Sequence, residues 1–506
     1  MVNLFLGIDI GTFETKGVLV DEQGVVQASA SKRHSISTPR ENYVEQDAEE
    51  VWWADLVFVA KRLMKTEVAK SSTIAAMACS AIGPCVLPID KNLAPLRPGI
   101  LYGVDARAGK QISELRERFG DDEIFAKSGN SLSSQSAGPK VMWVAQNEPE
   151  IAAMTEWYVT SQSFLVAKLT GEVTMDHGTA GYFHPLYDLK QQKWDITGCE
   201  DFVSAAQLPN LAWATEIAGY VTHAAALATG IPEGTVVAVG TTDSPAEAVG
   251  AGVVEAGDTM IQYGSAGYMI NVLDAPKSSS DLWSAPFVFP KSFVAAAGTA
   301  TAGTVTRWIC DLLDIDSSEG DEKLFTELID LAMQSKVGAN GVIFQAHLSG
   351  ERTPVQDANS RGIFFGLSLS HTRSDIARAA IEGIAHSLSY AFETYSTNGI
   401  EPERIKAIGG GTKNTILIES VSAILDKPQT VASSVGAAFG DAAIAAYAVG
   451  NLTSRSEILN WVGSEAQVGV NRDMQSRLQL DHEDYKALYE ATRALGTKRS
   501  LRARDG

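Results

Sequence analysis

The sequence predicts an α/β protein made of two related halves. Apolar residues make up 45% of the 506 positions, enough to bury more than one core. Three strands are predicted between Leu4 and Ser31, and a strand, a glycine turn and a second strand recur at 258–273. Helical periodicity follows each opening, so we expect two α/β units of similar build rather than a short-period repeat.

In the first half, the predicted strands are Leu4–Ile10, Gly17–Asp21 and Val25–Ser31, and a helix is expected over Glu49–Glu67. In the second half, we expect strands at 258–263 and 268–273, and helices at 373–392 and 413–425. The boundary is placed near residues 245–257. The predicted domains are therefore 1–246 and 247–470, followed within 471–506 by a C-terminal helix and then by a frayed polar tail, LGTKRSLRARDG (Leu495–Gly506).

Composition excludes several classes of function. The formal net charge is −20, and such a surface repels nucleic-acid backbones and anionic lipid, so we expect no nucleic-acid and no membrane partner. No apolar run is long enough to span a bilayer, and the N-terminus shows no signal sequence. The four cysteines have no metal-ligand spacing and are interpreted as buried, reduced thiols: Cys79, Cys85, Cys199 and Cys310. We expect a cytoplasmic protein, with a homodimer left open.

The first motif is LFLGIDIGTFETK, at residues 4–16. Alternation along a strand puts Leu4, Leu6, Ile8 and Ile10 on a core face, and puts two glycines around Asp9 on the other face. Glycines at Gly7 and Gly11 indicate that something approaches this backbone closely. Thr12 and Lys16 are suited to phosphate oxygens, and Asp9 to Mg²⁺ held through water. An ordinary hairpin explains a lone motif of this kind about equally well.

The second motif is VVAVGTTDSPAEAV, at residues 236–249. A helix is expected to begin at Pro245, with Ser244 and Glu247 forming a capping box. That leaves Asp243 as a carboxylate at the end of a buried strand, where α/β sheets bind ligands. We interpret Asp243 as a general base of ordinary pKa, near 3.9, and as a second candidate for contact with Mg²⁺.

Two further glycine turns complete the predicted site. Gly264 and Ser265 form a turn that can hold phosphate and is the counterpart of Gly11 and Thr12. The run AIGGGTKN ends a strand in three glycines before a helix, which suits a nucleotide lying against backbone. A plain glycine-rich strand–helix turn remains the alternative.

The helix at 373–392, with Thr372 and Asp375 at its start, is interpreted as structural.

Together these segments closely resemble the FGGY carbohydrate kinases. SAGPKVMWV (Ser136–Val144) resembles the first signature of that family, and Gly362–Glu382 the second. LSGERTP (Leu348–Pro354) looks most like the xylulokinases. The resemblance implies two ribonuclease H-like domains of the actin/hexokinase superfamily with a cleft between them, and ATP with Mg²⁺ as cofactors.

The resemblance also implies roles for individual residues. It makes Asp243 the base and places Asp9 near Mg²⁺. Around the phosphates it places Thr12, Lys16, Gly264 and Ser265. On the nucleotide side it places Gly303, Gly410, Gly411 and Asn414. On the sugar side it places Asp105 and Arg107, from YGVDARA, together with Ser244 and the 80–83 loop that contains Ser80 and Ile82.

The sequence departs from the xylulokinase pattern at the sugar side. Xylulokinases typically carry Met-His-Gly where this chain has Ala81-Ile82-Gly83, and Asn where it has Ser244. The CSAIG and VDARA stretches also resemble the autoinducer-2 kinases of the same family. The helix after Lys413 has Leu417 and Ser422-Ala423 where the family commonly has Trp and Ala-Asp.

The predicted function is ATP-dependent phosphorylation of a hydroxyl on a small ketose, a pentulose such as xylulose. The alternatives are a kinase for ribulose, erythritol, glycerol or an autoinducer-2-like substrate, and a non-catalytic sugar-sensing protein on the same fold. An actin- or chaperone-like ATPase is disfavoured by the two signatures.

Overall fold

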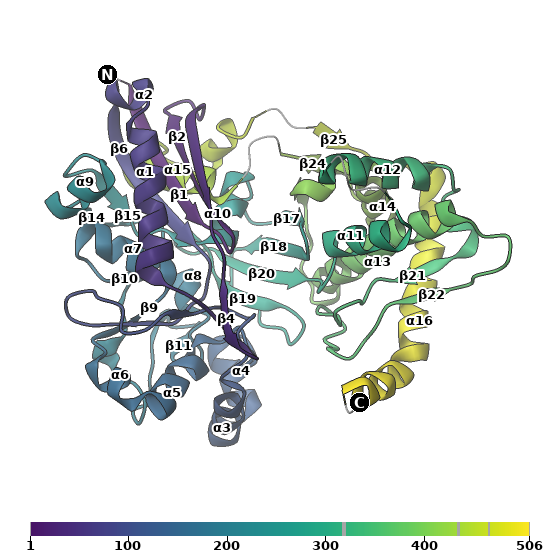
Figure 1. Ribbon diagram of the computed structural model, residues 1–506, viewed down its shortest axis with the longest axis horizontal. Helices are drawn as coiled ribbons and strands as arrows, with labels where there is room; N and C mark the ends of the chain where they lie inside the picture. The colour runs from purple at the N-terminus through teal and green to yellow at the C-terminus, as the bar shows by residue number, and fades with distance from the viewer. Residues whose placement is uncertain (1, 316–319, 433–435, 464–465, 505–506) are drawn as a thin grey trace. The chain divides into compact units, whose positions relative to one another are not determined.

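The computed structural model describes residues 2–315, 320–432, 436–463 and 466–504 and contains two compact units (Figure 1). Unit 1 contains Met1–Ala256, Val272–Ala295 and Ser434–Gly463. Unit 2 contains Gly257–Asn271, Ala296–Ser433 and Ser464–Gly506. Each unit therefore combines segments that are far apart in the sequence.

The predicted boundary near residues 245–257 ends beside Ala256, where the chain first leaves unit 1. The chain then returns to unit 1 at Val272–Ala295 and again at Ser434–Gly463. The division into 1–246, 247–470 and 471–506 stays a prediction of where the domains begin and end.

A mixed sheet forms the centre of unit 1. Strand β1 (Asn3–Ile10) pairs antiparallel with β2 (Glu14–Asp21) and parallel with β6 (Thr73–Ala81). The strand order is β14-β15-β6-β1-β2-β3, and β16 pairs with the end of β6. The remaining strands of this sheet are β3 (Val26–Arg33), β14 (Ile217–Tyr220), β15 (Val236–Ala238) and β16 (Thr241–Thr242). The three strands predicted at the N-terminus are confirmed, although β2 begins three residues earlier than expected.

Helices cover both faces of this sheet. The even-numbered residues of β1 are fully buried in one apolar cluster with residues of α1 (Ala54–Met64) and α7 (Ser161–Thr170), which confirms the predicted core face. The opposite face of β1 contacts α15 (Ala437–Ala448), and α15 also contacts α10 (Asp243–Gly250). The predicted helix at Glu49–Glu67 is divided into a π-helical turn, η1 (Ala48–Trp53), and α1.

Helix α15 lies very close to both of its neighbours because glycines remove side chains at the contacts. A Cβ atom on Gly7 would lie 1.8 Å from the carbonyl oxygen of Ala438, and one on Gly440 would lie 1.8 Å from that of Ala246. The sequence predicted that something approaches the backbone at Gly7. The structure shows that at Gly7 this is the backbone of α15.

Unit 1 contains further elements, several of which contribute residues to a second apolar cluster. They are β4 (Ser37–Arg40), β5 (Tyr43–Gln46), α2 (Glu67–Lys70), β7 (Leu87–Ile89), β8 (Gly99–Ile100), α3 (Gly109–Phe119), α4 (Asp121–Ser128), α5 (Ala137–Asn147), α6 (Pro149–Met154), β9 (Trp157–Val159), β10 (Thr174–Asp176), α8 (His177–Ala180), β11 (Tyr187–Asp188), β12 (Lys193–Trp194), η2 (Ala205–Gln207), β13 (Asn210–Ala212), α9 (His223–Thr229), β19 (Trp283–Pro286) and η5 (Arg455–Asn460).

Unit 2 contains the second strand–turn–strand opening that the sequence predicted. Strand β17 (Asp258–Tyr263) pairs antiparallel with β18 (Gly267–Leu273) and parallel with β23 (Arg404–Ile408). The strand order of this sheet is β19-β20-β18-β17-β23-β24-β25. The remaining strands are β20 (Phe293–Gly298), β24 (Gln429–Val431) and β25 (Ala466–Val468), with a separate hairpin of β21 (Ile343–Gln345) and β22 (Ile363–Phe365).

The helices of unit 2 include the long helix α13 (Arg373–Thr397), which begins with the predicted capping box of Thr372 and Asp375. It is longer than predicted and buried along most of its length, which agrees with its structural interpretation. The other helical elements are α11 (Gly303–Leu312), α12 (Asp321–Met333), η3 (Ala339–Gly341), η4 (Gly410–Lys413), α14 (Thr415–Leu425) and α16 (Arg472–Arg504).

The prediction of a frayed tail at 495–506 is wrong through Arg504, because α16 continues to that residue. Lys498, Arg499 and Arg502 lie in its last turns, where positive charge interacts favourably with the helix dipole. Lysine and arginine are also good helix formers. The last two residues lie outside the described part of the chain.

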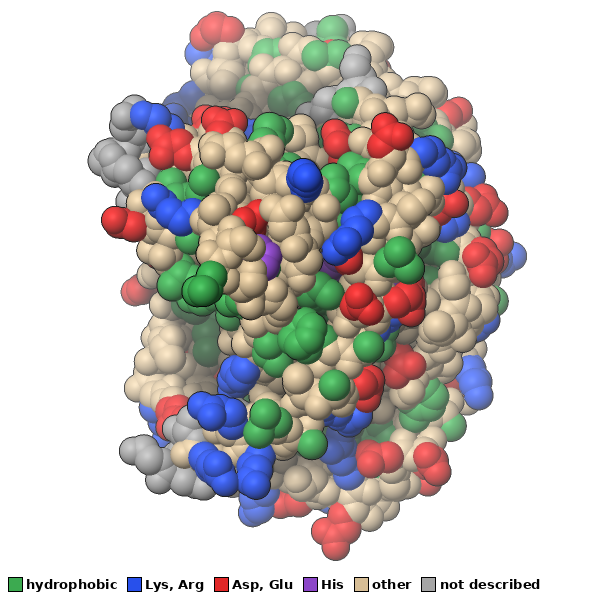
Figure 2. Space-filling view, turned by 90° about the vertical axis from the view of Figure 1, so that its right-hand side faces the viewer, with side chains coloured by type: hydrophobic (Ala, Val, Ile, Leu, Met, Phe, Trp, Pro, Cys, Tyr) green, Lys and Arg blue, Asp and Glu red, His purple; other side chains and the backbone are tan. Residues whose placement is uncertain are grey.

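The surface charges and the cysteines of the structure agree with the composition. Among the described residues, no helix has the length and apolar character needed to cross a membrane. Figure 2 shows Asp and Glu side chains interspersed with Lys and Arg on one face, rather than a single extended basic surface. All four cysteines are buried and unpaired, as predicted.

Candidate active site

Three candidate residues meet at the carboxyl ends of the parallel strands of unit 1. Asp9 on β1 is in register with Ser80 on β6, and Ser80 is in register with Thr241 on β16. Asp243 follows β16 directly and begins α10. In open α/β sheets, ligands bind at this edge. The structure therefore brings together Asp9, Ser80 and Asp243, which the sequence identified in separate segments.

Ser80 lies between two buried carboxyl groups. Its hydroxyl is 3.0 Å from Asp9 Oδ1 and 2.7 Å from Asp441 Oδ2. Burial raises the pKa of Asp9 well above its ordinary value, and the charge of Asp243 raises it further. Burial and the charge of Asp9 also raise the pKa of Asp441. Asp441 is 361 residues from Ser80 in the sequence, and no motif singled it out.

Asp243 has a raised pKa and a simple local environment. Its Oδ1 accepts hydrogen bonds from the backbone N–H of Ser244 at 2.8 Å and from the Ser244 hydroxyl at 3.3 Å. The surrounding protein removes solvent and raises the pKa of Asp243 from 3.8 to about 6, although the bonds from Ser244 oppose this shift. The sequence assumed an ordinary pKa for this residue. The structure makes Asp243 a stronger base, better matched to neutral pH.

The start of α10 differs from the prediction. The helix begins at Asp243 rather than Pro245, because the chain turns into the helix as soon as β16 ends at Thr242. Thr242 occupies the N-cap position without a side-chain cap, and the Ser244 hydroxyl bonds to Asp243 instead. The predicted capping box is therefore wrong, although Asp243 does not occupy the N-cap position either.

Glu247 is a second carboxyl group, one helical turn from Asp243 on α10. Residues four apart lie on the same side of a helix. Burial raises the pKa of Glu247 to about 7, with a further contribution from Asp243, whereas Lys16 opposes the shift. The sequence interpretation used Glu247 only as a capping residue, and its spacing from Asp243 was the signal that could have identified it.

The glycine turn after β1 is supported by His34 and Asp55. Gly11 donates its N–H to the carbonyl oxygen of Glu14 at 3.0 Å. His34 Nε2 is 3.0 Å from the carbonyl oxygen of Gly11, and His34 Nδ1 is 2.8 Å from Asp55 Oδ2. The His34 ring therefore links the backbone of this turn to the buried Asp55 carboxyl group. This contact fixes the turn in unit 1 that the sequence assigned to phosphate.

Thr12 and Lys16 remain accessible on this turn. The Thr12 hydroxyl is 3.0 Å from the Tyr102 hydroxyl, and Thr12 itself is only partly buried. Lys16 is exposed, and its ammonium is 3.6 Å from Glu14 Oε2. Both side chains are therefore placed where they can meet an incoming ligand, and their contact with phosphate stays a prediction.

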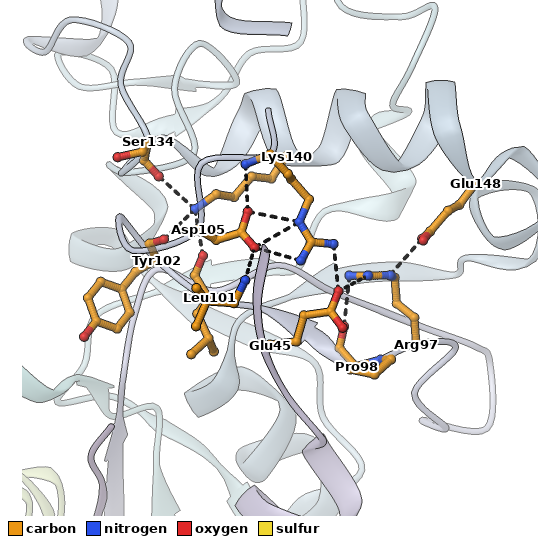
Figure 3. A network of polar contacts seen from close by, with 11 residues as sticks. Glu45, Arg97, Pro98, Leu101, Tyr102, Asp105, Ser134, Lys140 and Glu148 are labelled. Atoms are coloured by element: carbon orange, nitrogen blue, oxygen red, sulfur yellow. Dashed lines mark hydrogen bonds and ion pairs between the residues drawn. The ribbon is translucent and has the colours of Figure 1, made fainter. Parts of the chain in front are cut away.

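Asp105 and Arg107, expected on the sugar side, are both buried and bind each other. Asp105 accepts hydrogen bonds from Arg107 Nη2 at 2.7 Å and from the backbone N–H of Val44 at 2.7 Å. Arg107 also forms an ion pair with Glu45 at 2.7 Å. Figure 3 shows Asp105 and Glu45 within this network, which continues to Arg97. The geometry supports a structural role for the pair, and sugar binding by it stays a prediction.

The same network contains Lys140, from the stretch that resembles the first signature. Its ammonium donates to the carbonyl oxygens of Leu101, Tyr102 and Ser134 at 2.7, 2.9 and 2.8 Å (Figure 3). Burial lowers the pKa of Lys140 to about 8. The lysine therefore holds the chain around Tyr102, the residue that contacts Thr12.

Ile82, another residue expected on the sugar side, belongs to the core. Its side chain is fully buried in the same apolar cluster as β1. Its N–H donates to the carbonyl oxygen of Ile10 at 2.8 Å, and its carbonyl oxygen accepts from the Ser161 hydroxyl. The side chain has no exposed surface to offer a sugar, so the geometry does not support this prediction.

In unit 2, the structure brings Gly264, Ser265 and Gly303 together. The N–H of Gly303 donates to the carbonyl oxygen of Gly264 at 2.9 Å, and that of Ala302 donates to Ser265 at 2.9 Å. A Cβ atom on Gly303 would lie 2.8 Å from the Gly264 carbonyl oxygen. The first turn of α11 is therefore packed on the glycine–serine turn after β17.

The turn after β23 lies beside the end of β17, since these strands are parallel neighbours. A Cβ atom on Gly411 would lie 2.9 Å from Tyr263 Cβ, whereas Gly410 is exposed with open space around it. Asn414 caps α14 by accepting the N–H of Leu417 at 3.1 Å. Gly410 therefore offers open backbone to a ligand, while Asn414 has a structural function whether or not it also contacts nucleotide.

Carboxylates dominate the possible metal ligands of unit 1. Mg²⁺ prefers oxygen donors and keeps part of its water, so it needs few protein ligands. In the described ranges, no group of three or more His, Cys, Asp or Glu residues is arranged to hold a metal by itself. Asp9 and Asp243 could supply carboxylate oxygens to an ion that takes its other ligands from water and phosphate, and their contact with Mg²⁺ stays a prediction.

The chain matches two family models. The N-terminal domain of the FGGY family of carbohydrate kinases matches residues 4–250, and its C-terminal domain matches residues 260–449. Among curated proteins, the xylulose kinase of Escherichia coli is 28% identical, with 96% of this chain and 99% of the relative covered. The gluconokinase of Bacillus subtilis is 27% identical, with 92% and 91% covered.

Solved structures show the same similarity. The xylulose kinase from Rhodospirillum rubrum is 26% identical, with a TM-score of 0.90 and with 97% of this chain and 99% of that chain covered. A gluconate kinase from Lactobacillus acidophilus, 23% identical, has a TM-score of 0.89 over 97% of this chain and 98% of its own, which is a similarity of fold.

Proposed function

Since the chain belongs to the FGGY family of carbohydrate kinases, which are ATP-dependent sugar phosphotransferases, we propose that its acceptor is a pentulose such as xylulose and that Asp243 is the general base. The observation that carries the mechanism is the position of Asp243, at the carboxyl edge of the unit 1 sheet with Asp9 and Ser80. The similarity to xylulose kinases along nearly the whole chain supports the acceptor.

Asp243 would orient the attacking hydroxyl and accept its proton. Phosphoryl transfer has a loose transition state, so catalysis depends mainly on positioning and on charge neutralisation. A pKa of about 6 leaves Asp243 ionised at neutral pH while giving it more proton affinity than an exposed aspartate. The donor hydrogen bonds from Ser244 keep its Oδ1 fixed.

Each unit has its own candidate contacts for phosphate, and Mg²⁺ would neutralise the phosphate charge when bound. In unit 1, the candidates are Thr12, Lys16 and the backbone beside Gly11; in unit 2, they are Gly264, Ser265 and the start of α11. Asp9 would hold Mg²⁺ through water. The charge of Asp243 lies close enough to raise the pKa of Asp9. Gly410 and Gly411 would lie against the nucleotide.

Gluconate is the second candidate acceptor, because gluconokinases are among the similar proteins over more than 90% of the chain. The fully buried Ile82 and the replacement of the xylulokinase Met-His-Gly also leave the acceptor side different from that pattern. Ribulose, erythritol, glycerol and an autoinducer-2-like compound complete the set to compare.

A substrate panel tests the acceptor. ADP release at fixed Mg·ATP should be fastest with xylulose, and a clear preference for gluconate or glycerol would replace the pentulose proposal. Asp243→Ala should lower kcat by at least about two orders of magnitude with the best acceptor, the usual scale for loss of a general base. A near-normal rate in this variant would remove Asp243 from the mechanism.

We also propose a cytoplasmic location, which the four buried, unpaired thiols support because reduced cysteines are typical of that compartment. The homodimer stays a prediction. Light scattering of the purified chain measures its mass in solution and decides between monomer and dimer.

A further inference from the structure

We propose that Asp441 is a positioning residue, which fixes the orientation of the Asp9 carboxylate through the hydroxyl of Ser80. The inference deepens the proposed function and rests on it, since Asp9 is the residue assigned to Mg²⁺. Asp441 lies on α15, outside both glycine turns and outside every motif identified in the sequence. No contact of Asp441 with a substrate is required.

The contacts form a short chain of three residues. Asp441 Oδ2 is 2.7 Å from the Ser80 hydroxyl and accepts the backbone N–H of Ser80 at 3.0 Å. The same hydroxyl is 3.0 Å from Asp9 Oδ1. Asp441 and Ser80 are completely buried, and Asp9 is 9% exposed. Water therefore does not compete for these contacts, and the orientation of Asp9 depends on the other two side chains.

The Ser80 hydroxyl lies between the two carboxyl groups, so its direction depends on both of them. It is 2.7 Å from Asp441 Oδ2 and 3.0 Å from Asp9 Oδ1. Asp441 Oδ2 also accepts the backbone N–H of Ser80, which holds the serine at the end of β6. A carboxyl group at residue 441 therefore sets the position and direction of the hydroxyl that contacts Asp9.

A contribution to the stability of the fold does not explain the presence of an aspartate at residue 441. Its other oxygen, Oδ1, has no hydrogen-bond partner within the part of the chain that the structure describes. A buried polar atom without a partner costs free energy, so an apolar residue would fit this helix face at lower cost. Gly7 and Gly440 allow the close packing of α15 that brings Asp441 to Ser80. The chain therefore has a buried carboxyl group that costs folding free energy at a position where it contacts Ser80.

A purely structural role is the rival explanation, since Asp441 also bonds to the backbone of Ser80 and so ties α15 to β6. The two explanations differ in one respect. A positioning residue acts through Asp9, so its removal should change cation binding only while Asp9 is present. A structural tie would affect the protein whether or not Asp9 is present.

The test measures binding of Mn²⁺, as a probe for Mg²⁺, by electron paramagnetic resonance with the full chain and β,γ-methylene ATP. Asp441→Ala and Asp441→Leu should each weaken Mn²⁺ binding by about 10- to 100-fold, the usual effect of losing a residue that orients a metal ligand. Leucine is included because its side chain branches at the same atom as that of aspartate but has no oxygen to accept the hydroxyl and the N–H of Ser80. It keeps the test valid if the alanine variant does not fold.

The same substitutions are then made in an Asp9→Asn background, where they should cause no further loss of Mn²⁺ binding. Asp21→Asn is the control, because Asp21 is also a buried carboxylate of unit 1 but bonds only within its own hairpin and turn, to Gln23, Val25 and Gln27. It should bind Mn²⁺ like the wild type.

Two results would overturn the proposal: wild-type Mn²⁺ binding in both Asp441 variants, or an equal loss with and without Asp9. Turnover of the wild-type chain with the sugar panel is measured separately. Absence of turnover there would count against the proposed function, whereas the Mn²⁺ comparison still decides the role of Asp441.

Discussion

Asp243 is the residue on which the proposed chemistry depends, and its surroundings set its affinity for a proton. Burial raises its pKa to about 6, and its charge in turn raises the pKa values of Asp9 and Glu247. These carboxyl groups were predicted from different motifs, or in the case of Glu247 only as a cap. Asp243 raises the pKa values of the other two only because the fold brings the three carboxyl groups to one edge of the sheet.

The raised pKa of Asp243 predicts the pH dependence of the reaction. A base must be deprotonated to act, so kcat/KM should fall as the pH drops below about 6, rather than below about 4 as expected for an exposed aspartate. Initial rates between pH 4.5 and 8 with the best acceptor measure this midpoint. Enzyme held at each low pH and then assayed at pH 7.5 controls for unfolding. A midpoint below about 5 would contradict the assignment.

At the scale of elements, helix α15 decides how the site of unit 1 is built. It packs on β1 at Gly7 and on α10 at Gly440, and it carries Asp441 to Ser80. Local sequence patterns identified the strand and the helix α10. They did not show that a helix from the last hundred residues lies against both of them, because hydrophobic periodicity describes a face and not its partner.

Gly440→Ala should destabilise the protein by about 1–3 kcal/mol or more, because the new Cβ atom would overlap the carbonyl oxygen of Ala246 and force α10 and α15 apart. Urea unfolding followed by circular dichroism measures the loss. Gly109→Ala is the matched control, since no atom lies within 4 Å of the Cβ it would add at the start of α3. Equal stability of the two variants would show that the close contact is not important.

At the scale of the whole molecule, the candidate residues are divided between the two units. Unit 1 contains Asp9, Ser80 and Asp243, whereas unit 2 contains the turns at 264–265 and 409–411 and the start of α11. The proposed function therefore assigns the acceptor to one unit and the nucleotide mainly to the other. The two ligands should therefore protect different segments of the chain from amide exchange.

Hydrogen exchange measured by mass spectrometry tests this division. ADP with Mg²⁺ should slow amide exchange at 264–267, 299–304 and 409–415, and the sugar alone should slow it at 243–245. The middle of α16 is the internal control and should exchange equally with and without either ligand. Protection of the same peptides by both ligands, each added alone, would contradict the assignment of separate sides.

Much of the site could be predicted from the sequence because the signals are local. A glycine turn after a strand at Gly11 and Gly264, and a carboxylate after a buried strand at Asp243, follow from neighbouring residues alone. The start of α10 was misplaced because the position of β16 decides it. The continuation of the predicted C-terminal helix to Arg504 was missed because this basic, polar segment has no strong apolar stripe. The sequence could not show that Ile82, Asp105 and Arg107 are buried, and their burial is what indicates a structural role for them.

The sequence by itself therefore determined the α/β class, the two strand–turn–strand openings, the family resemblance and the choice of Asp243. Only the tertiary structure decided that Asp441 meets Ser80 across 361 residues, that α15 occupies the space beside Gly7, and that Asp243 has a raised pKa. The reason is physical. Propensity and periodicity act between neighbours in the chain, whereas desolvation and long-range hydrogen bonds arise only when distant segments pack together.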